Sequence, residues 1–123
     1  MPLPALCIRL SFTYGVAAVL VGLGMAMSGN HAISVAHAHL VLIGWLGLLG
    51  TGLLLRAYPA LAAGPGRWIV HLMAAGAPVQ FIGIALDHSG VHAAEPLAVI
   101  GSFMVAAAIA WQALRVWTTD LGD

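Results

Sequence analysis

Residues 33–57 read ISVAHAHLVLIGWLGLLGTGLLLRA, and this stretch decides the fold of the chain. Arg56 carries its only permanent charge and stands at its end. A helix needs about 20 apolar residues to cross the hydrocarbon core of a bilayer, which is about 30 Å thick. The stretch is long enough and apolar enough, so it predicts a transmembrane helix that contains two histidines, His37 and His39.

The rest of the chain repeats this pattern. Long apolar runs separated by short polar or glycine- and proline-rich turns predict four transmembrane helices, over residues 6–27, 33–57, 67–87 and 93–117. No linker is long enough to separate domains. The sequence therefore predicts a single transmembrane domain over residues 1–123, all-α in class, built as an integral membrane four-helix bundle.

The composition agrees with a membrane location and excludes several classes of protein. The 123 residues are 62% hydrophobic and 7% charged, with a formal net charge of zero and a mean hydropathy of +1.02. A soluble domain has about 25% charged residues, so a soluble enzyme, a disordered chain and a DNA-binding module are all excluded. We expect a lipid membrane as partner and no nucleic acid. The single cysteine, Cys7, excludes an intramolecular disulfide and a cysteine-based zinc site.

The arginines predict the orientation. Arg9 and Arg67 lie near the starts of the first and third spans, and Arg56 and Arg115 lie near the ends of the second and fourth. In an antiparallel array all of them fall at the same end. The positive-inside rule then predicts that this end is cytoplasmic, with both the N- and C-termini inside.

Two histidines in one short apolar helix are the main functional signal. His37 and His39 are two positions apart, which is about 200° around an α-helix. They cannot bind the same metal ion, because chelating pairs on a helix are three or four residues apart. An ionisable side chain in a span normally faces protein or a cofactor. Each histidine is therefore expected to serve a different partner.

The α-helical period also places a glycine below each histidine. Gly44 falls below His37, and Gly50 falls below His39, so each imidazole is expected above an apolar surface with space for a flat ligand. A planar macrocycle needs this combination, and haem iron is commonly held by an axial histidine. The alternative is that both histidines make polar helix–helix contacts with carbonyl or hydroxyl groups.

Three further features bear on the interior and on a second site. His71 lies one turn from Arg67 and is either a second-site ligand or an interfacial histidine. His88 and His92 flank a turn at the other end, where either a copper or zinc site or a solvated loop is expected. Pro78 removes the N–H that would bond to the carbonyl of Ala74, and Gln80 is expected to satisfy this region or a neighbouring helix.

Residues 37–59, HAHLVLIGWLGLLGTGLLLRAYP, carry a resemblance to known families. They resemble the haem-ligating helix of the catalytic subunit, subunit I, of the heme-copper oxidase and nitric oxide reductase superfamily. Most of the chain also resembles a group of short bacterial membrane proteins with a His-Ala-His-Leu…Gly-Trp…Tyr-Pro signature. This resemblance implies a location in the bacterial inner (cytoplasmic) membrane.

The superfamily's catalytic subunit has twelve helices in three arcs of four, and the chain resembles one arc. The resemblance implies a homo-oligomer, with a trimer favoured and a dimer as the alternative. Haem b would be held between protomers by His37 of one copy and His39 of the next, which makes these two residues ligands of the haem iron. The implied role is electron transfer or redox sensing with a respiratory electron-transfer partner.

The chain departs from the superfamily at its second metal centre. It has no adjacent histidine pair, no glutamate deep in a span and no match to the redox-active tyrosine. A complete oxygen- or nitric-oxide-reducing site is not visible, and whether the chain is an enzyme stays open. Three alternatives to electron transfer remain: a gas-binding or oxidoreductase haem or metal site, an oxidase assembly factor or a haem or metal carrier, and a structural protein.

Overall fold

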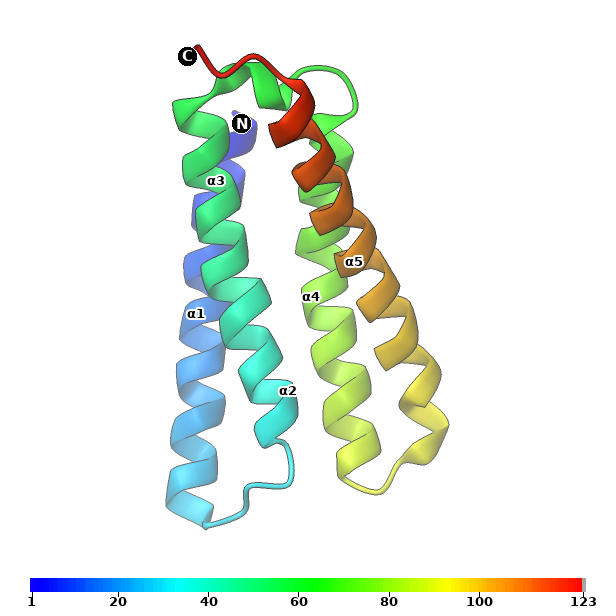
Figure 1. The fold of residues 1–123 in the computed structure, drawn as a ribbon. Coiled ribbons are helices and arrows are strands. Elements are labelled where there is room, and N and C mark those ends of the chain that lie inside the picture. The colour runs from blue at the N-terminus through cyan, green and yellow to red at the C-terminus, as the bar shows by residue number, and fades with distance from the viewer. Residues whose placement is uncertain (123) are drawn as a thin grey trace.

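The computed structural model describes residues 1–122, which form four membrane-length helices joined by short turns (Figure 1). The first helix is α1 (Leu3–Ser28). The second is continuous over three segments, α2 (Ser34–His39), the π-helix η1 (Leu40–Gly47) and α3 (Leu48–Ala57), and we call it the second span. The short 3-10 helix η2 (Pro59–Ala62) leads into α4 (Gly66–His88), and η3 (His92–Ala94) leads into α5 (Glu95–Thr118).

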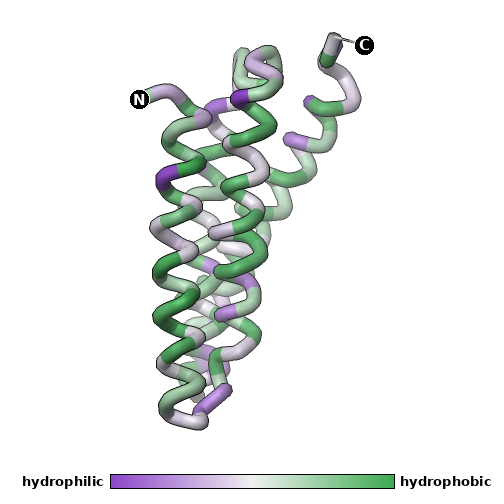
Figure 2. The backbone as a smooth tube through the Cα atoms, turned by 90° about the vertical axis from the view of Figure 1, so that its left-hand side faces the viewer, coloured by the Kyte–Doolittle hydropathy of each residue, from purple (hydrophilic) through white to green (hydrophobic). Residues whose placement is uncertain are grey.

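The structure confirms the all-α class, and its four long helices match the predicted ranges closely. The largest difference in a helix end is in α1, which begins at Leu3 rather than at residue 6. Hydrophobic residues cover most of the length of each helix, and hydrophilic residues are few (Figure 2). Each of the four helices is long and apolar enough to cross a membrane, which supports an integral membrane protein.

The helices form an open array. The α1 helix packs along the second span, α4 packs against both of them, and α5 packs mainly along α4 (Figure 1). The two clusters of buried apolar side chains are centred on Leu48 and Met73, and on Cys7, Leu55 and Val70. The second of these clusters joins the start of α1, the end of α3 and the start of α4.

Both ends of the chain lie at the same end of the array (Figure 1). Because the four helices alternate in direction, Arg9, Arg56, Arg67 and Arg115 also lie toward this end, which we call the arginine end. The opposite end carries His31, His37, His39, His88 and His92, and we call it the histidine end. The arginines are thus concentrated at one end of the array, as the positive-inside rule assumes for the cytoplasmic side. The assignment of this end to the cytoplasm stays a prediction.

The hydrogen bonds around Pro78 confirm the expectation for this part of α4. The Tyr14 hydroxyl on α1 donates to the carbonyl oxygen of Ala74 at 2.6 Å, and so takes up the acceptor that proline leaves free. Gln80 forms a hydrogen bond to the neighbouring helix, in which its Nε2 donates to Ser102 Oγ on α5 at 2.8 Å. These two bonds tie α4 to a helix on either side.

The second span differs from the regular α-helix that the sequence predicts. Residues 40–47 are π-helical, and the N–H of Leu48 donates to the carbonyl of Ile43, five residues back. The buried positions in this part are four apart: Ala36, Leu40, Gly44 and Leu48. A four-residue step overshoots one α-helical turn by about 40°, and the wider π turn reduces this overshoot. The α-helical angles that align Gly44 with His37 and Gly50 with His39 therefore do not hold beyond Leu40.

Candidate functional site

His39 is the last residue of α2, and its ring is oriented by the backbone. Its Nδ1 lies 2.8 Å from the carbonyl oxygen of Val35. A carbonyl only accepts, so Nδ1 carries the proton and Nε2 keeps its lone pair in the neutral ring. Metal-binding histidines almost always donate their other ring N–H in this way. The tautomer and the anchored ring of His39 are compatible with metal binding through Nε2, although His88 makes the same type of bond to the carbonyl of Ile84.

His37 faces a different neighbour. Its ring packs against α1 at Gly22, where an added Cβ would lie 3.0 Å from the imidazole Cε1. Its Nδ1 is buried and has no hydrogen-bond partner within residues 1–122. A buried polar atom without a partner is unfavourable, so this nitrogen gains a hydrogen bond only if the ring moves from its place on Gly22.

The two glycines predicted with the histidines lie elsewhere. An added Cβ at Gly44 would lie 3.2 Å from Tyr14 Cβ, so this glycine allows close packing of the second span on α1. Gly50 has no atom within 4 Å of an added Cβ and lines a groove between the second span and α5. It is roughly 15 Å along the helix from His39. The candidate site therefore depends on the two histidines rather than on these glycines.

Trp45 is a feature that the sequence reading missed. Its indole packs on Gly15 of α1, where an added Cβ would lie 2.9 Å from Cδ2, and its Nε1 is buried without a partner among the described residues. Gly15 and Gly22 are seven residues apart, or about two turns on one face of α1. This seven-residue spacing of glycines could have predicted that two rings of the second span pack on the same face of α1.

Of the histidines predicted for a second site, His88 and His92 both lie beside Asp87, whereas His71 lies far from them. His71 is exposed on α4 toward the arginine end, whereas His88 closes the same helix 17 positions later, on the order of 25 Å away. His92 Nδ1 lies 2.8 Å from Asp87 Oδ1, and His88 Nδ1 lies 3.1 Å from the carbonyl oxygen of Ile84. Across residues 1–122 no group of three or more His, Cys, Asp or Glu side chains is placed to hold a metal ion.

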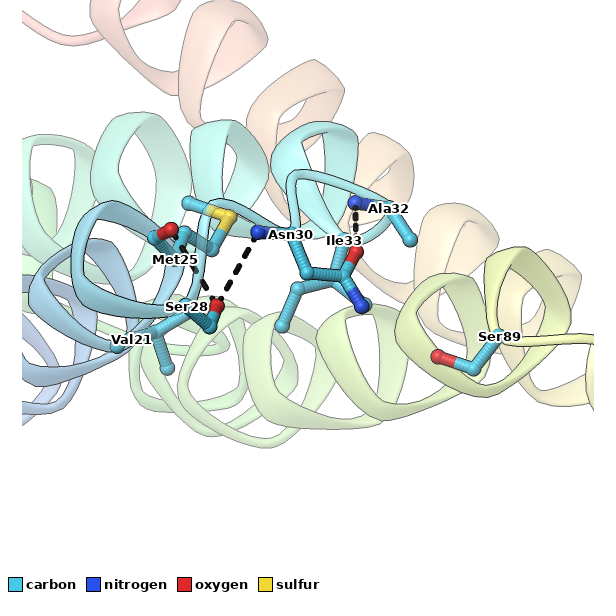
Figure 3. Close-up of a pocket in the computed structure, with 8 residues that line it drawn as sticks. Val21, Met25, Ser28, Asn30, Ala32, Ile33 and Ser89 are labelled. Atoms are coloured by element: carbon cyan, nitrogen blue, oxygen red, sulfur yellow. Dashed lines mark hydrogen bonds between the residues drawn. The ribbon is translucent and has the colours of Figure 1, made fainter.

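A pocket of about 370 Å³ opens at the histidine end between α1, the turn after it and the end of α4 (Figure 3). Its polar groups already bond locally. The backbone N–H of Asn30 donates to Ser28 Oγ, the N–H of Ala32 donates to Asn30 Oδ1, and Ser89 Oγ donates to the carbonyl of Ala85. No histidine lines this pocket, so it is separate from the candidate site.

Comparisons of the chain with protein-family models, with curated proteins and with solved structures find no match. The resemblance to the heme-copper oxidase superfamily therefore rests on the sequence pattern of residues 37–59.

Proposed function

We propose that this chain is a membrane b-type haem-binding protein that transfers electrons or senses redox state within the membrane. The observation that supports this proposal most directly is the ring of His39. Its Nδ1–H is held by the carbonyl of Val35 at 2.8 Å, which leaves Nε2 as a donor to iron. An ionisable residue inside a span is a candidate functional residue, and the other nitrogen of this imidazole is available as a ligand.

The two histidines of the second span would hold the haem iron, His39 as it stands and His37 after a change of ring position. His39 would supply one ligand, and His37 of a neighbouring copy would supply the other, in a homo-oligomer for which we favour a trimer. Where the ring now lies, the Nδ1 of His37 is buried and has no partner within the described chain, so no hydrogen bond of this atom holds the ring in place. The ring would have to turn away from Gly22 to reach iron between copies.

Haem b, when bound, supplies one-electron chemistry at a potential set by its ligands and surroundings. The chain contributes the rest. The Val35 carbonyl holds the tautomer and direction of His39 and raises the basicity of its free nitrogen. The apolar helices around α2 keep the dielectric low, which disfavours the more highly charged oxidised state. The redox partner would be a component of a respiratory chain in a bacterial inner membrane.

The proposal is tested by the absorption spectrum of protein purified from haem-sufficient cells. We expect a Soret band, and we expect His39→Ala to remove most of it because no other imidazole of the second span has a free, oriented nitrogen. His37→Ala should lower the band and change the coordination of the iron. His31→Ala is the matched control, because His31 is exposed in the turn after α1 and bonds only to the carbonyl of Gly29.

Haem stoichiometry and mass in detergent test the arrangement between copies. One haem for each protomer in a homo-oligomer is the expected result. A protein without a Soret band, or with a band that survives both substitutions in the second span, would contradict the proposal. Haem loss in His31→Ala equal to that in His39→Ala would show that the effect is not specific to the site.

The difference between the two histidines favours a second candidate function. Of the two, only His39 has a ring nitrogen that is hydrogen-bonded to a carbonyl, whereas the ring of His37 packs against α1 of its own protomer. If His39 alone held iron, the haem would be five-coordinate and open to a gas. A shift of the reduced spectrum on addition of carbon monoxide would select this gas-binding function, and no shift would select the six-coordinate electron-transfer protein.

A further inference from the structure

The turn between α4 and α5 brings two histidines to one carboxylate. His92 Nδ1 lies 2.8 Å from Asp87 Oδ1, and His88 Nδ1 lies 3.9 Å from Asp87 Oδ2. The two histidines are four residues apart, but the helix ends between them at Ser89, so they are not a pair on one helical face. Their position beside the same carboxylate has to come from the turn itself.

The backbone of this turn has the hydrogen bonds of a Schellman motif. The N–H of Val91 donates to the carbonyl of Leu86 at 2.9 Å, and the N–H of Gly90 donates to the carbonyl of Asp87 at 3.0 Å. Gly90 has a φ of 96°, a positive value that glycine adopts without strain. These bonds redirect the chain at the end of α4, and His92 therefore lies next to Asp87 in the last turn of that helix.

Both imidazoles are oriented through Nδ1. His92 Nδ1 donates to the Asp87 carboxylate, and His88 Nδ1 donates to the carbonyl of Ile84 at 3.1 Å. An ionised carboxylate and a carbonyl only accept, so each neutral ring carries its proton on Nδ1 and keeps the lone pair of Nε2. A carboxylate bonded to Nδ1 also raises the basicity of the opposite nitrogen, as in many metal-binding histidines.

Two such imidazoles suit Cu²⁺ better than Zn²⁺. Zinc sites in proteins have three or four protein ligands, and within residues 1–122 no third side chain of His, Cys, Asp or Glu is placed to complete such a set. Cu²⁺ binds nitrogen ligands most tightly of the divalent first-row metals and accepts a square-planar arrangement. The side chains of His88 and His92 are 41% and 83% exposed, so water can fill the other positions.

We infer that the turn between α4 and α5 binds Cu²⁺ through Nε2 of His88 and Nε2 of His92, with Asp87 as a positioning residue. Both Nδ1 atoms lie beside the same carboxylate, so the two Nε2 atoms can reach one ion by rotation of exposed rings. The site lies at the histidine end and outside residues 37–59. It depends neither on the resemblance of that stretch nor on the proposed haem.

The test is a titration of the full chain with Cu²⁺ in detergent, after purification with a tag that contains no histidine. Electron paramagnetic resonance of the bound ion reports how many nitrogens coordinate it. We expect one tight site for each protomer, with two nitrogens. His88→Ala and His92→Ala should each weaken binding and leave a single nitrogen.

His31→Ala is the matched control for these variants. His31 is an exposed histidine at the same end, and its Nδ1 is also bonded to a carbonyl, that of Gly29, but it has no place in the turn between α4 and α5. The substitution should leave the affinity for Cu²⁺ and the number of nitrogens unchanged. An equal loss in His31→Ala would overturn the inference, because any exposed imidazole would then serve.

Asp87→Asn tests the positioning role. The amide oxygen still accepts from His92 Nδ1 but carries no charge, so we expect two nitrogens in the spectrum and an affinity for Cu²⁺ that is lower by about tenfold or more. A spectrum with one nitrogen in the unchanged chain, or binding that survives either His88→Ala or His92→Ala, would overturn the inference. Since haem is measured by its Soret band, this site and the proposed function can fail separately.

Discussion

The α4–α5 contact and the contact between α1 and the second span both depend on glycine, in different ways. In the α4–α5 contact, an added Cβ at Gly83 would meet the backbone of Ala98, and one at Gly101 would meet the backbone of Gln80. In the other contact, two glycines of α1 meet rings. Gly15 receives the indole of Trp45, and Gly22 receives the imidazole of His37.

This difference separates a contact that fixes the fold from one that can carry chemistry. Backbone packed on backbone cannot adjust, and it brings Gln80 and Ser102 into a hydrogen bond at 2.8 Å. A ring packed on glycine can rotate or shift at small cost. The two rings also retain buried nitrogens, His37 Nδ1 and Trp45 Nε1, that have no partner within residues 1–122. The contact between α1 and the second span is therefore the one that can adjust if His37 moves, and the following predictions test that comparison.

The largest effect is expected for Gly83→Val, which should lower the free energy of unfolding by more than about 3 kcal/mol. The new side chain would meet backbone atoms around Ala98, so two helices have to separate. Thermal unfolding followed by circular dichroism measures the change. Gly24→Val is the control, because its position is open, and a loss of the same size there would show that valine in a helix, not the contact, is responsible.

Smaller losses are expected for Gly15→Ala and Gly22→Ala, each about 1–2 kcal/mol, because a ring rather than backbone has to move. The new methyl groups would start 2.9 Å from Trp45 Cδ2 and 3.0 Å from His37 Cε1. If His37 ligates haem, Gly22→Ala alone should change the Soret band. A change of equal size in both variants would contradict a special role for His37.

Tyr14→Phe should reduce stability by about 1 kcal/mol, because it removes the 2.6 Å hydrogen bond to the carbonyl of Ala74. This bond links the two contacts, since it joins α1 to α4. Unfolding in a graded series of denaturing detergent gives the change. Tyr58→Phe, at an exposed tyrosine after α3, should have no measurable effect, and equal losses would rule out the bond as the cause.

The smallest effects are expected at the Gln80–Ser102 bond. Ser102→Ala should cost about 0.6 kcal/mol, a typical value for one hydrogen bond between membrane helices. Gln80→Leu should cost even less, although it removes the same bond. The Oε1 atom of Gln80 is buried without a partner in the described chain, and the substitution removes that unfavourable group as well. Detergent unfolding of the two variants side by side tests this order, and a larger loss in Gln80→Leu would reverse it.

Much of the fold could be predicted from the sequence because span length and apolarity are local properties. The four helices, the shared end of the arginines and the free carbonyl of Ala74 follow from rules that concern one helix at a time. Tyr14 as the partner of that carbonyl could not be predicted, because it is 60 residues away in sequence and the pairing depends on how α1 packs against α4.

The candidate site could be predicted only in part. The separation of His37 from His39 follows from the first turns of the span, where the helix is α-helical. The positions of Gly44 and Gly50 could not be obtained from the same angles, because the π-helix begins at Leu40. No local pattern in residues 40–47 distinguishes π-helical from α-helical hydrogen bonding. The packing of Gly44 on Tyr14 is a tertiary contact, which a local pattern does not reveal.

The π-helix at Leu40–Gly47 has a consequence for how the chain tolerates a change in length. Each ring of a π ladder encloses one residue more than an α ring, so this segment holds surplus chain. If a single residue were deleted here, the segment could adopt α-helical hydrogen bonds, and the flanking segments α2 and α3 would still face their neighbours. The same deletion in the middle of α4 would turn half of that helix away from α5.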